Sequence, residues 1–221
     1  MAPAIKLTYF DIEGVAEAVR LALVLSGTEF EDVRVKFPEW GALKPTTKFG
    51  QLPIMTIDNG PQRVQSKAML RWVGANCSET LYPSDKLLDI EEAIGLVEDL
   101  NGAFRPAGFP DKSAHPEGFF DTEEGKKLIQ TLREKYVAEA LPKYVKFLSD
   151  LIKANDGKWL ASKGEPTIAD CFAVPILRNF TRGHLDYVPT SCLDFDEVIV
   201  DYIKRFCAIE SVKGRYNNGI F

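Results

Sequence analysis

Residues 49–60 read Phe-Gly-Gln-Leu-Pro-Ile-Met-Thr-Ile-Asp-Asn-Gly, a pattern typical of a short buried strand followed by a tight turn. The apolar run begins at Pro53 and ends at Ile57, and Asp58-Asn59-Gly60 has the composition of a hairpin turn. The sequence therefore predicts that the chain returns as a second strand at Arg63–Gln65.

The residues on either side of this hairpin predict the rest of one compact unit. Ser66 is suited to cap a helix that ends near Cys77. Upstream, residues 3–9 alternate as in a strand, residues 14–26 place apolar side chains at helical spacing, and residues 30–35 alternate again. The expected order is βαβ, a long loop and then ββα, which is the order of the thioredoxin-like fold.

The second half of the chain is helical in pattern. Residues 79–87 indicate a linker, so we expect a thioredoxin-like domain over residues 1–78 and an all-helical domain over residues 88–221. Residues 105–121 hold several prolines, glycines and phenylalanines and predict a loop. A long helix should follow, and Pro142 is expected to bend it.

Composition excludes several classes of function. The 221 residues carry a net charge of −5, which gives no attraction to nucleic-acid phosphates. No apolar stretch is long enough to span a membrane, and residues 1–6 do not begin a secretory signal. Two histidines and four cysteines without a CxxC pair give no recognisable metal site. We expect a cytoplasmic protein without metal, nucleic-acid or membrane partners.

Three segments of the N-terminal half carry groups suited to binding a peptide thiol. Tyr9 ends the first strand, Gly50–Pro53 precedes the third, and Gln65-Ser66 lies at a strand-to-helix turn. In the expected sheet these segments converge at one end. A helix N-terminus binds a carboxylate, a cis proline exposes the backbone before it to an extended peptide, and a tyrosine hydroxyl donates to a thiolate.

In these segments the chain resembles the sigma-class glutathione transferases. The resemblance extends to about Phe180, and a capping box in the helical half adds to it. The matching runs, in family order and spacing, are Leu7-Thr8-Tyr9-Phe10 with Gly14 and Ala16-Glu17, Trp40–Thr46, Phe49–Pro53, Gln65–Arg71, and Gly164 and Pro166 with Thr167-Ile168-Ala169-Asp170.

The resemblance implies that glutathione is the co-substrate and that the Tyr9 hydroxyl stabilises its thiolate for attack on a small hydrophobic electrophile. It also implies a homodimer in which Asp99 of the partner subunit completes the glutathione site. The other implied contacts are Trp40 and Lys44 for the glycyl end, Gln51 and Leu52 ahead of a cis Pro53 for the cysteinyl backbone, and Gln65 and Ser66 for the γ-glutamyl group. The electrophile pocket is implied near Tyr9, Val15, Phe104 and Gly108.

The turn after Tyr9 departs from the family. Sigma-class members usually carry Arg-Gly-Arg where this chain has Glu13-Gly14-Val15. The second arginine normally supports the tyrosine and the thiolate, so Val15 is expected to weaken thiol activation, and Glu13 adds a like charge nearby. These changes concern turnover rather than glutathione binding. The long loop at residues 105–121 is expected to cover or reshape the electrophile pocket.

Two alternative functions stay open at this stage. The missing arginine favours a non-catalytic protein that binds glutathione or another ligand on the same fold. Sigma-class members also include glutathione-dependent isomerases of prostaglandin endoperoxides. A glutaredoxin or a cysteine-type transferase needs a cysteine near the first strand–helix turn, and the first cysteine here is Cys77.

Overall fold

The N-terminal domain is built on a three-stranded sheet. The computed structural model describes residues 3–216, and its strands are β1 (Ile5–Phe10), β2 (Phe30–Val35) and β3 (Ile54–Ile57) in the order β2-β1-β3. β1 pairs in parallel with β2 and antiparallel with β3. A parallel pair needs a crossover connection, and α1 (Glu17–Leu25) supplies it.

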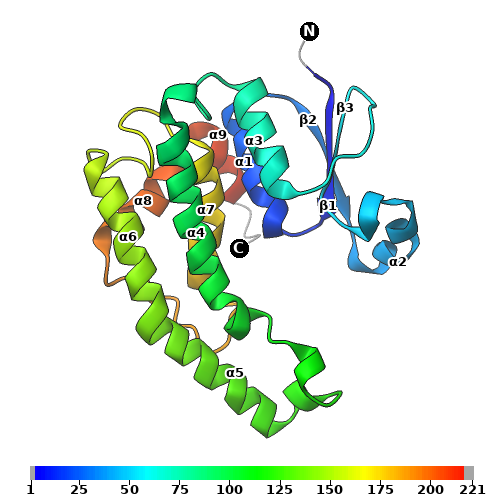
Figure 1. Ribbon diagram of the computed structural model, residues 1–221, viewed down its shortest axis with the longest axis vertical. Helices are drawn as coiled ribbons and strands as arrows, with labels where there is room; N and C mark the ends of the chain where they lie inside the picture. Colours follow the sequence, from blue (N-terminus) through cyan, green and yellow to red (C-terminus); the bar gives the residue numbers. More distant parts are fainter. Residues whose placement is uncertain (1–2, 217–221) are drawn as a thin grey trace.

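Two helices cover one face of this sheet, as Figure 1 shows: α1 and α3 (Ser66–Cys77). Ile5 and Leu7 of β1 are buried and belong to the same apolar core as the inward faces of these helices. The connection between β2 and β3 contains short helical turns, of which α2 (Trp40–Leu43) is one.

The expected fourth strand is reduced to a single bridge. Arg63 pairs with Met55 through two backbone hydrogen bonds of 2.8 and 2.9 Å. Gln65 then adopts a φ of 78°, which is incompatible with a strand and directs the chain into α3. The prediction of a returning strand at Arg63–Gln65 was therefore wrong beyond its first residue.

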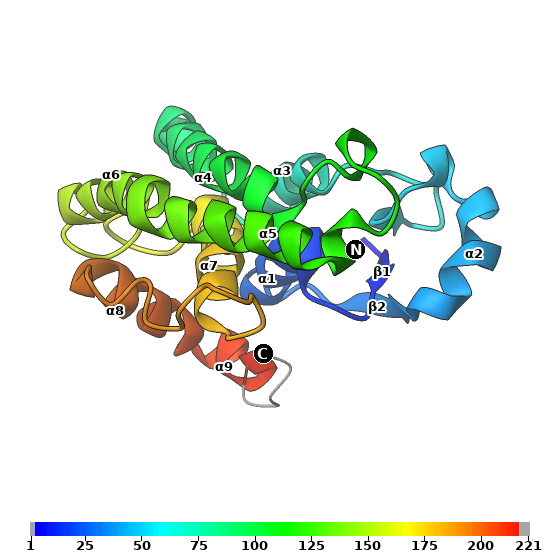
Figure 2. The same cartoon turned by 90° about the horizontal axis from the view of Figure 1, so that it is seen from below.

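The second domain is helical, as predicted. Figures 1 and 2 show α7 at its centre, and this helix packs against both α1 and α4. Its helices are α4 (Leu87–Gly108), α5 (Glu123–Lys135), α6 (Leu141–Ala154), α7 (Ile168–Thr181), α8 (Glu197–Cys207) and α9 (Glu210–Tyr216). The domain bounds 1–78, 79–87 and 88–221 remain a prediction, and their ends at residues 1–2 and 217–221 lie outside the described residues.

Two prolines interrupt the long helices differently. Pro142 lies in the first turn of α6, and a π-helical segment, Tyr136–Ala140, joins α5 to α6 immediately before it. Pro106 lies inside the last turn of α4, which continues to Gly108, so the expected loop begins at Phe109 rather than at residue 105. The carbonyl oxygen of Ala107, at the end of α4, accepts a hydrogen bond from another helix: Arg133 Nε of α5 donates to it at 3.2 Å.

The capping box at the start of α7 is confirmed. The Thr167 backbone N–H donates to Asp170 at 2.7 Å, and the Thr167 side chain accepts from the backbone of Ala169 at 3.2 Å. Asp170 is fully buried and also accepts from the Leu160 backbone N–H (3.0 Å) and the Tyr202 hydroxyl (2.9 Å). Within residues 3–216, no helix combines the length and the apolar character that crossing a membrane requires.

Candidate active site

The register of the sheet brings the three predicted binding segments together. β1 and β3 pair Thr8 with Ile54, so the next residues, Tyr9 and Pro53, are neighbours at the same end of the sheet. The bridge between Met55 and Arg63 likewise places Gln65 beside Pro53. Tyr9, the proline turn and the start of α3 therefore meet at one edge, as the sequence predicted.

The proline turn and the start of α3 have the backbone geometry expected of a peptide site. The Leu52–Pro53 peptide bond is cis, and Gln51 before it is exposed. The sequence predicted Ser66 as the N-cap of α3, but Ser66 is the first residue of the helix; the N-cap is Gln65, which makes no side-chain capping bond. The first turn of α3 offers backbone N–H groups and a positive dipole end. Gln65 holds its φ of 78° directly before this turn, a strained conformation that is common at binding sites.

The α2 segment places Trp40 next to this edge. The Trp40 ring lies edge-on to Phe10, 5.6 Å between centroids, and Phe10 stacks on Phe37 at 4.8 Å. Lys44 is exposed, and its aliphatic chain lies over Gly50, where a Cβ would be 3.4 Å from the lysine Cε. Gly50 has a φ of 61°, so glycine suits both the conformation and the contact.

Asp99 lies on the exposed surface of α4. Its neighbour Glu98 contacts the Lys67 ammonium in the first turn of α3 at 2.5 Å. The structure holds one chain, so the contribution of Asp99 of the partner subunit remains a prediction.

The Tyr9 hydroxyl is enclosed by the turn that follows β1. Tyr9 is 8% exposed, and Gly14 passes so close that a Cβ there would lie 2.5 Å from the phenolic oxygen. Burial raises the pKa of Tyr9, while a hydrogen bond from the Val15 backbone and the charge of Arg20 act in the opposite direction. The net shift is upward, so Tyr9 keeps its proton at neutral pH and is a hydrogen-bond donor.

A buried arginine fixes this turn from beneath. Arg20 has no exposed surface, and its guanidinium lies 5.7 Å from the centroid of the Tyr9 ring. It donates to the carbonyl oxygens of Ile12 (2.8 Å) and Glu13 (3.3 Å), and to Asp32 (3.1 Å). Sequence reasoning missed this residue, because an arginine within a helical apolar pattern is usually solvent-exposed.

Comparison with known proteins shows the family of this chain. The family model for the glutathione S-transferase N-terminal domain matches residues 5–74, and the model for the C-terminal domain matches residues 115–215. The chain belongs to the glutathione S-transferase family.

Individual relatives of this glutathione S-transferase cover most of its length. Glutathione S-transferase 1 of Ascaris suum is 29% identical over 83% of this chain and 86% of its own. Glutathione S-transferase S1 of Drosophila melanogaster is 32% identical over 75% of this chain and 60% of its own, which supports the sigma-class resemblance. The solved structure of prostaglandin synthase D of Nilaparvata lugens superimposes with a TM-score of 0.74, at 27% identity over 96% of each chain.

The charge of Glu13 in this family member is compensated. Glu13 is 7% exposed, and its carboxylate lies 2.9 Å from Arg182 Nη1 and 3.7 Å from Arg178 Nη1, both from the helical domain. Burial nevertheless raises the pKa of Glu13 to about 7, against the lowering effect of these arginines. The sequence predicted an added like charge near the thiol at Glu13, whereas the Glu13 carboxylate forms an ion pair with Arg182 across the domain boundary.

The expected electrophile-pocket residues do not all face the same space. Val15 is 57% exposed at the turn. Phe104 is buried and packs edge-on against Tyr136 and Phe180, 5.0 Å between centroids in each case, so it belongs to the core of the helical domain. Gly108 lies against this ring, where a Cβ would approach it to 2.5 Å.

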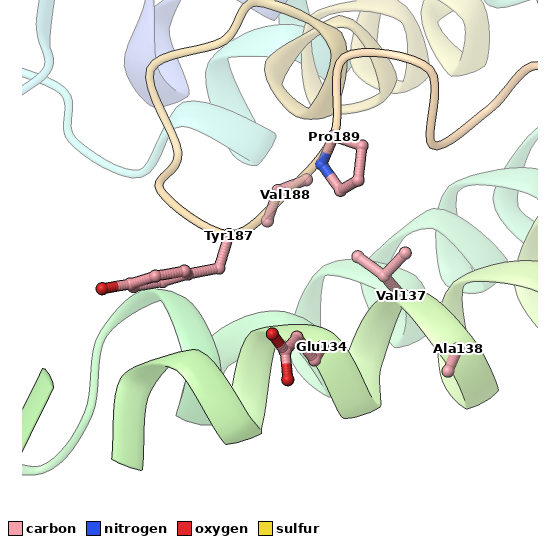
Figure 3. A pocket seen from close by; sticks show the side chains of 6 residues that line it. All are labelled: Glu134, Val137, Ala138, Tyr187, Val188 and Pro189. Atoms are coloured by element: carbon pink, nitrogen blue, oxygen red, sulfur yellow. The ribbon is translucent and has the colours of Figure 1, made fainter. Parts of the chain in front are cut away.

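A hollow of about 490 Å³ lies elsewhere on the helical domain, between the end of α5 and the segment after α7 (Figure 3). It shares no residue with the predicted glutathione site. Its lining residues are Glu134, Val137, Ala138, Tyr187, Val188 and Pro189. Among residues 3–216, no three histidine, cysteine or acidic side chains are grouped so that they could hold a metal ion.

Proposed function

We propose that this chain transfers the glutathione thiolate to small hydrophobic electrophiles and that the Tyr9 hydroxyl stabilises the thiolate. The observation that carries this proposal is the position of Tyr9: a buried, protonated phenol at the sheet edge shared by cis Pro53 and the start of α3. Membership of a transferase family supplies the reaction class.

The proposed binding mode follows from the geometry of the edge. Glutathione lies extended along the backbone of Gln51 and Leu52, with its γ-glutamyl carboxylate at Gln65 and the N-terminus of α3. Its glycyl end reaches Trp40 and Lys44. The positive end of the α3 dipole and the free N–H groups of its first turn favour a carboxylate.

The proposed chemistry uses Tyr9 as a donor. A free thiol has a pKa of about 8.5, and each unit by which it is lowered corresponds to about 1.4 kcal/mol of thiolate stabilisation. The Tyr9 O–H donates to the sulfur while the Val15 N–H donates to the phenolic oxygen, which makes the phenol a stronger donor. The sulfur lone pair then forms the new S–C bond, and the leaving group departs with its electron pair.

The proposed assembly is a cytoplasmic homodimer in which Asp99 of the partner subunit contacts the γ-glutamyl amine. Its exposed position on α4, next to Glu98, which contacts Lys67 in the first turn of α3, supports this role. Sedimentation velocity at micromolar concentration tests the assembly. A monomer that binds glutathione with undiminished affinity after Asp99→Ala would remove Asp99 from the site.

A second candidate is a glutathione-dependent isomerase of prostaglandin endoperoxides. The similarity to prostaglandin synthase D of Nilaparvata lugens favours it. Both reactions need the same thiolate, so they differ only in the electrophile. Direct assay of the isomerised product decides between them.

Tyr9→Phe tests the central role. Removing the only proposed O–H donor to the sulfur should lower kcat toward a chloronitrobenzene substrate roughly 100-fold, as for the loss of one preorganised donor. Glutathione affinity by calorimetry should stay unchanged, because the backbone contacts remain. Tyr144→Phe on α6 is the matched control. Wild-type turnover in Tyr9→Phe would exclude Tyr9, and glutathione binding by the wild-type chain without turnover would favour the non-catalytic alternative.

A further inference from the structure

The turn between Tyr9 and α1 is held from both domains. From its own domain, Arg20 binds the carbonyl oxygens of Ile12 and Glu13. From the helical domain, Arg182 at the end of α7 binds the Glu13 carboxylate at 2.9 Å. A second arginine of the helical domain, Arg215 of α9, makes a bidentate contact with Glu17 at 2.8 and 3.0 Å.

This anchoring acts on the residues that touch the phenol. Glu13 directly precedes Gly14, whose backbone fits against the Tyr9 hydroxyl with no room for a Cβ. Val15, one residue further, has its backbone N–H close enough to that hydroxyl to act against the rise in its pKa. A displacement of Glu13 by a fraction of an ångström is therefore carried directly into the contact on which the phenol depends.

The residue at position 15 makes this backbone contact more important here. Val15 has no polar side chain to offer the phenol or the sulfur, so its backbone N–H is the polar group that it presents. The orientation of a backbone N–H is set by its neighbours in the chain, and the neighbour with a bond to the other domain is Glu13.

We propose that Glu13 is a positioning residue for thiol activation, which fastens the Tyr9–α1 turn to α7 through Arg182 and Arg178 and so aligns the Val15 N–H with the Tyr9 hydroxyl. This inference rests on the proposed role of Tyr9. Sigma-class members usually carry an arginine at this position. The proposal gives the acidic side chain found here a function in the reaction.

The charges around Glu13 make this anchor sensitive to pH. Arg178 and Arg182 face Glu13 from the last turn and the end of α7. The other charged or titratable groups that interact with its charge are Glu17 of α1, Arg215 of α9 and Cys207 of α8. With its pKa raised to about 7, Glu13 gains a proton as the pH falls below neutrality and its attraction to Arg182 weakens. Thiolate stabilisation should therefore decline over the same range.

Glu13→Gln tests the proposal, with the exposed Glu31→Gln of β2 as the control. The thiol pKa of bound glutathione, read from thiolate ultraviolet absorbance, should rise by about one unit in Glu13→Gln, which lowers the thiolate fraction and kcat about tenfold at pH values below that pKa. KM for glutathione should change less than about twofold, since the peptide contacts are untouched. Glu31→Gln should match the wild type in every respect.

A double-mutant cycle separates positioning from a general loss of structure. Arg182→Gln should raise the thiol pKa as Glu13→Gln does, and the double variant should add little to either, because both remove one contact. Glu13→Asp, which keeps the charge, should restore part of the activity.

An unchanged thiol pKa in both Glu13→Gln and Arg182→Gln overturns the inference, as do fully additive effects or a loss of glutathione affinity that matches the loss of kcat. Absence of bound thiolate in the wild type would instead refute the proposed function. If Glu13→Gln does not fold, Arg182→Gln and Glu13→Asp carry the test.

Discussion

Two buried carboxylates, Asp170 and Glu13, are held in opposite ways. Asp170 accepts hydrogen bonds from neutral donors: the backbone N–H groups of Leu160 and Thr167 and the Tyr202 hydroxyl. Glu13 is held by guanidinium groups. The first arrangement joins segments of one domain, and the second joins two domains at a turn beside the proposed site.

The difference shows what each arrangement is suited to do. Burial raises the pKa of both carboxyls, and at Asp170 the hydrogen bonds act against that shift from every side. The backbone N–H groups of Leu160 and Thr167 have little freedom to move, so they hold the Asp170 carboxylate in one geometry. Glu13 depends on two long side chains from α7, so its contact responds to protonation and to movement between the domains. A rigid anchor suits stability, and an adjustable one suits control of a site.

The largest expected effect is on stability, from Asp170→Ala. The change leaves the Tyr202 hydroxyl and two buried N–H groups unpaired and removes the capping box, which should lower the free energy of unfolding by about 4 kcal/mol. Urea denaturation measures it, with the exposed Asp150→Ala of α6 as the control. A loss as small as that of the control would contradict the comparison, because Asp170 would then not be the anchor of its domain.

Gly14→Ala should affect both the fold and the site. The new Cβ would meet the Tyr9 oxygen at 2.5 Å at a φ of 44°, so the turn must shift, at an expected cost of about 2 kcal/mol and most of the turnover. Gly27→Ala is the matched control, since Gly27 also has a positive φ but no atom within 4 Å of the added Cβ. It should cost about 1 kcal/mol and keep full activity. Equal turnover in the two variants would show that the Gly14 contact is not needed.

The third expected effect concerns stability alone, through its pH dependence at Glu13. Its folded pKa of about 7 lies above the ordinary 4.5, so the stability gained from the protonated form is present below pH 4.5 and is lost as the pH rises through 7. The wild type should therefore become less stable relative to Glu13→Gln over that interval, by up to about 3 kcal/mol. Unfolding curves of both proteins from pH 5 to 8 measure this. A constant difference would show that Glu13 titrates normally.

Local signals in the sequence predicted much of the fold and of the sheet edge at which we propose that glutathione binds. The capping box at Thr167 and the proline turn at Pro53 each depend on a few adjacent residues, and both were found where expected. The start of α3 was predicted to within one residue, because Gln65 and not Ser66 is its N-cap. The strand at Arg63–Gln65 failed because Gln65 takes a left-handed conformation that alternation does not reveal.

The ion pairs of Glu13 and Glu17 with arginines of the helical domain had no such local signal in the sequence. The bonds from Glu13 to Arg182 and from Glu17 to Arg215 join residues 169 and 198 positions apart. Their partners follow from the packing of α1 against α7 and α9, which sequence periodicity does not specify. Phe104 was misplaced for the same reason: an aromatic residue near the end of a helix can face the core or a pocket, and the neighbouring helices decide which.

The pairing of Glu17 with Arg215 also bears on how the protein is made. α9 is synthesised after every other described element, yet it supplies the cation that neutralises a carboxylate of α1, one of the first helices to leave the ribosome. Until α9 docks, Glu17 has Arg20 as its one ionic contact within residues 3–216, and Arg20 also binds Asp32 and the carbonyl oxygens of the Tyr9 turn. A nascent chain can therefore fold its sheet early, but the turn beside Tyr9 acquires its full set of contacts only when translation has passed residue 215.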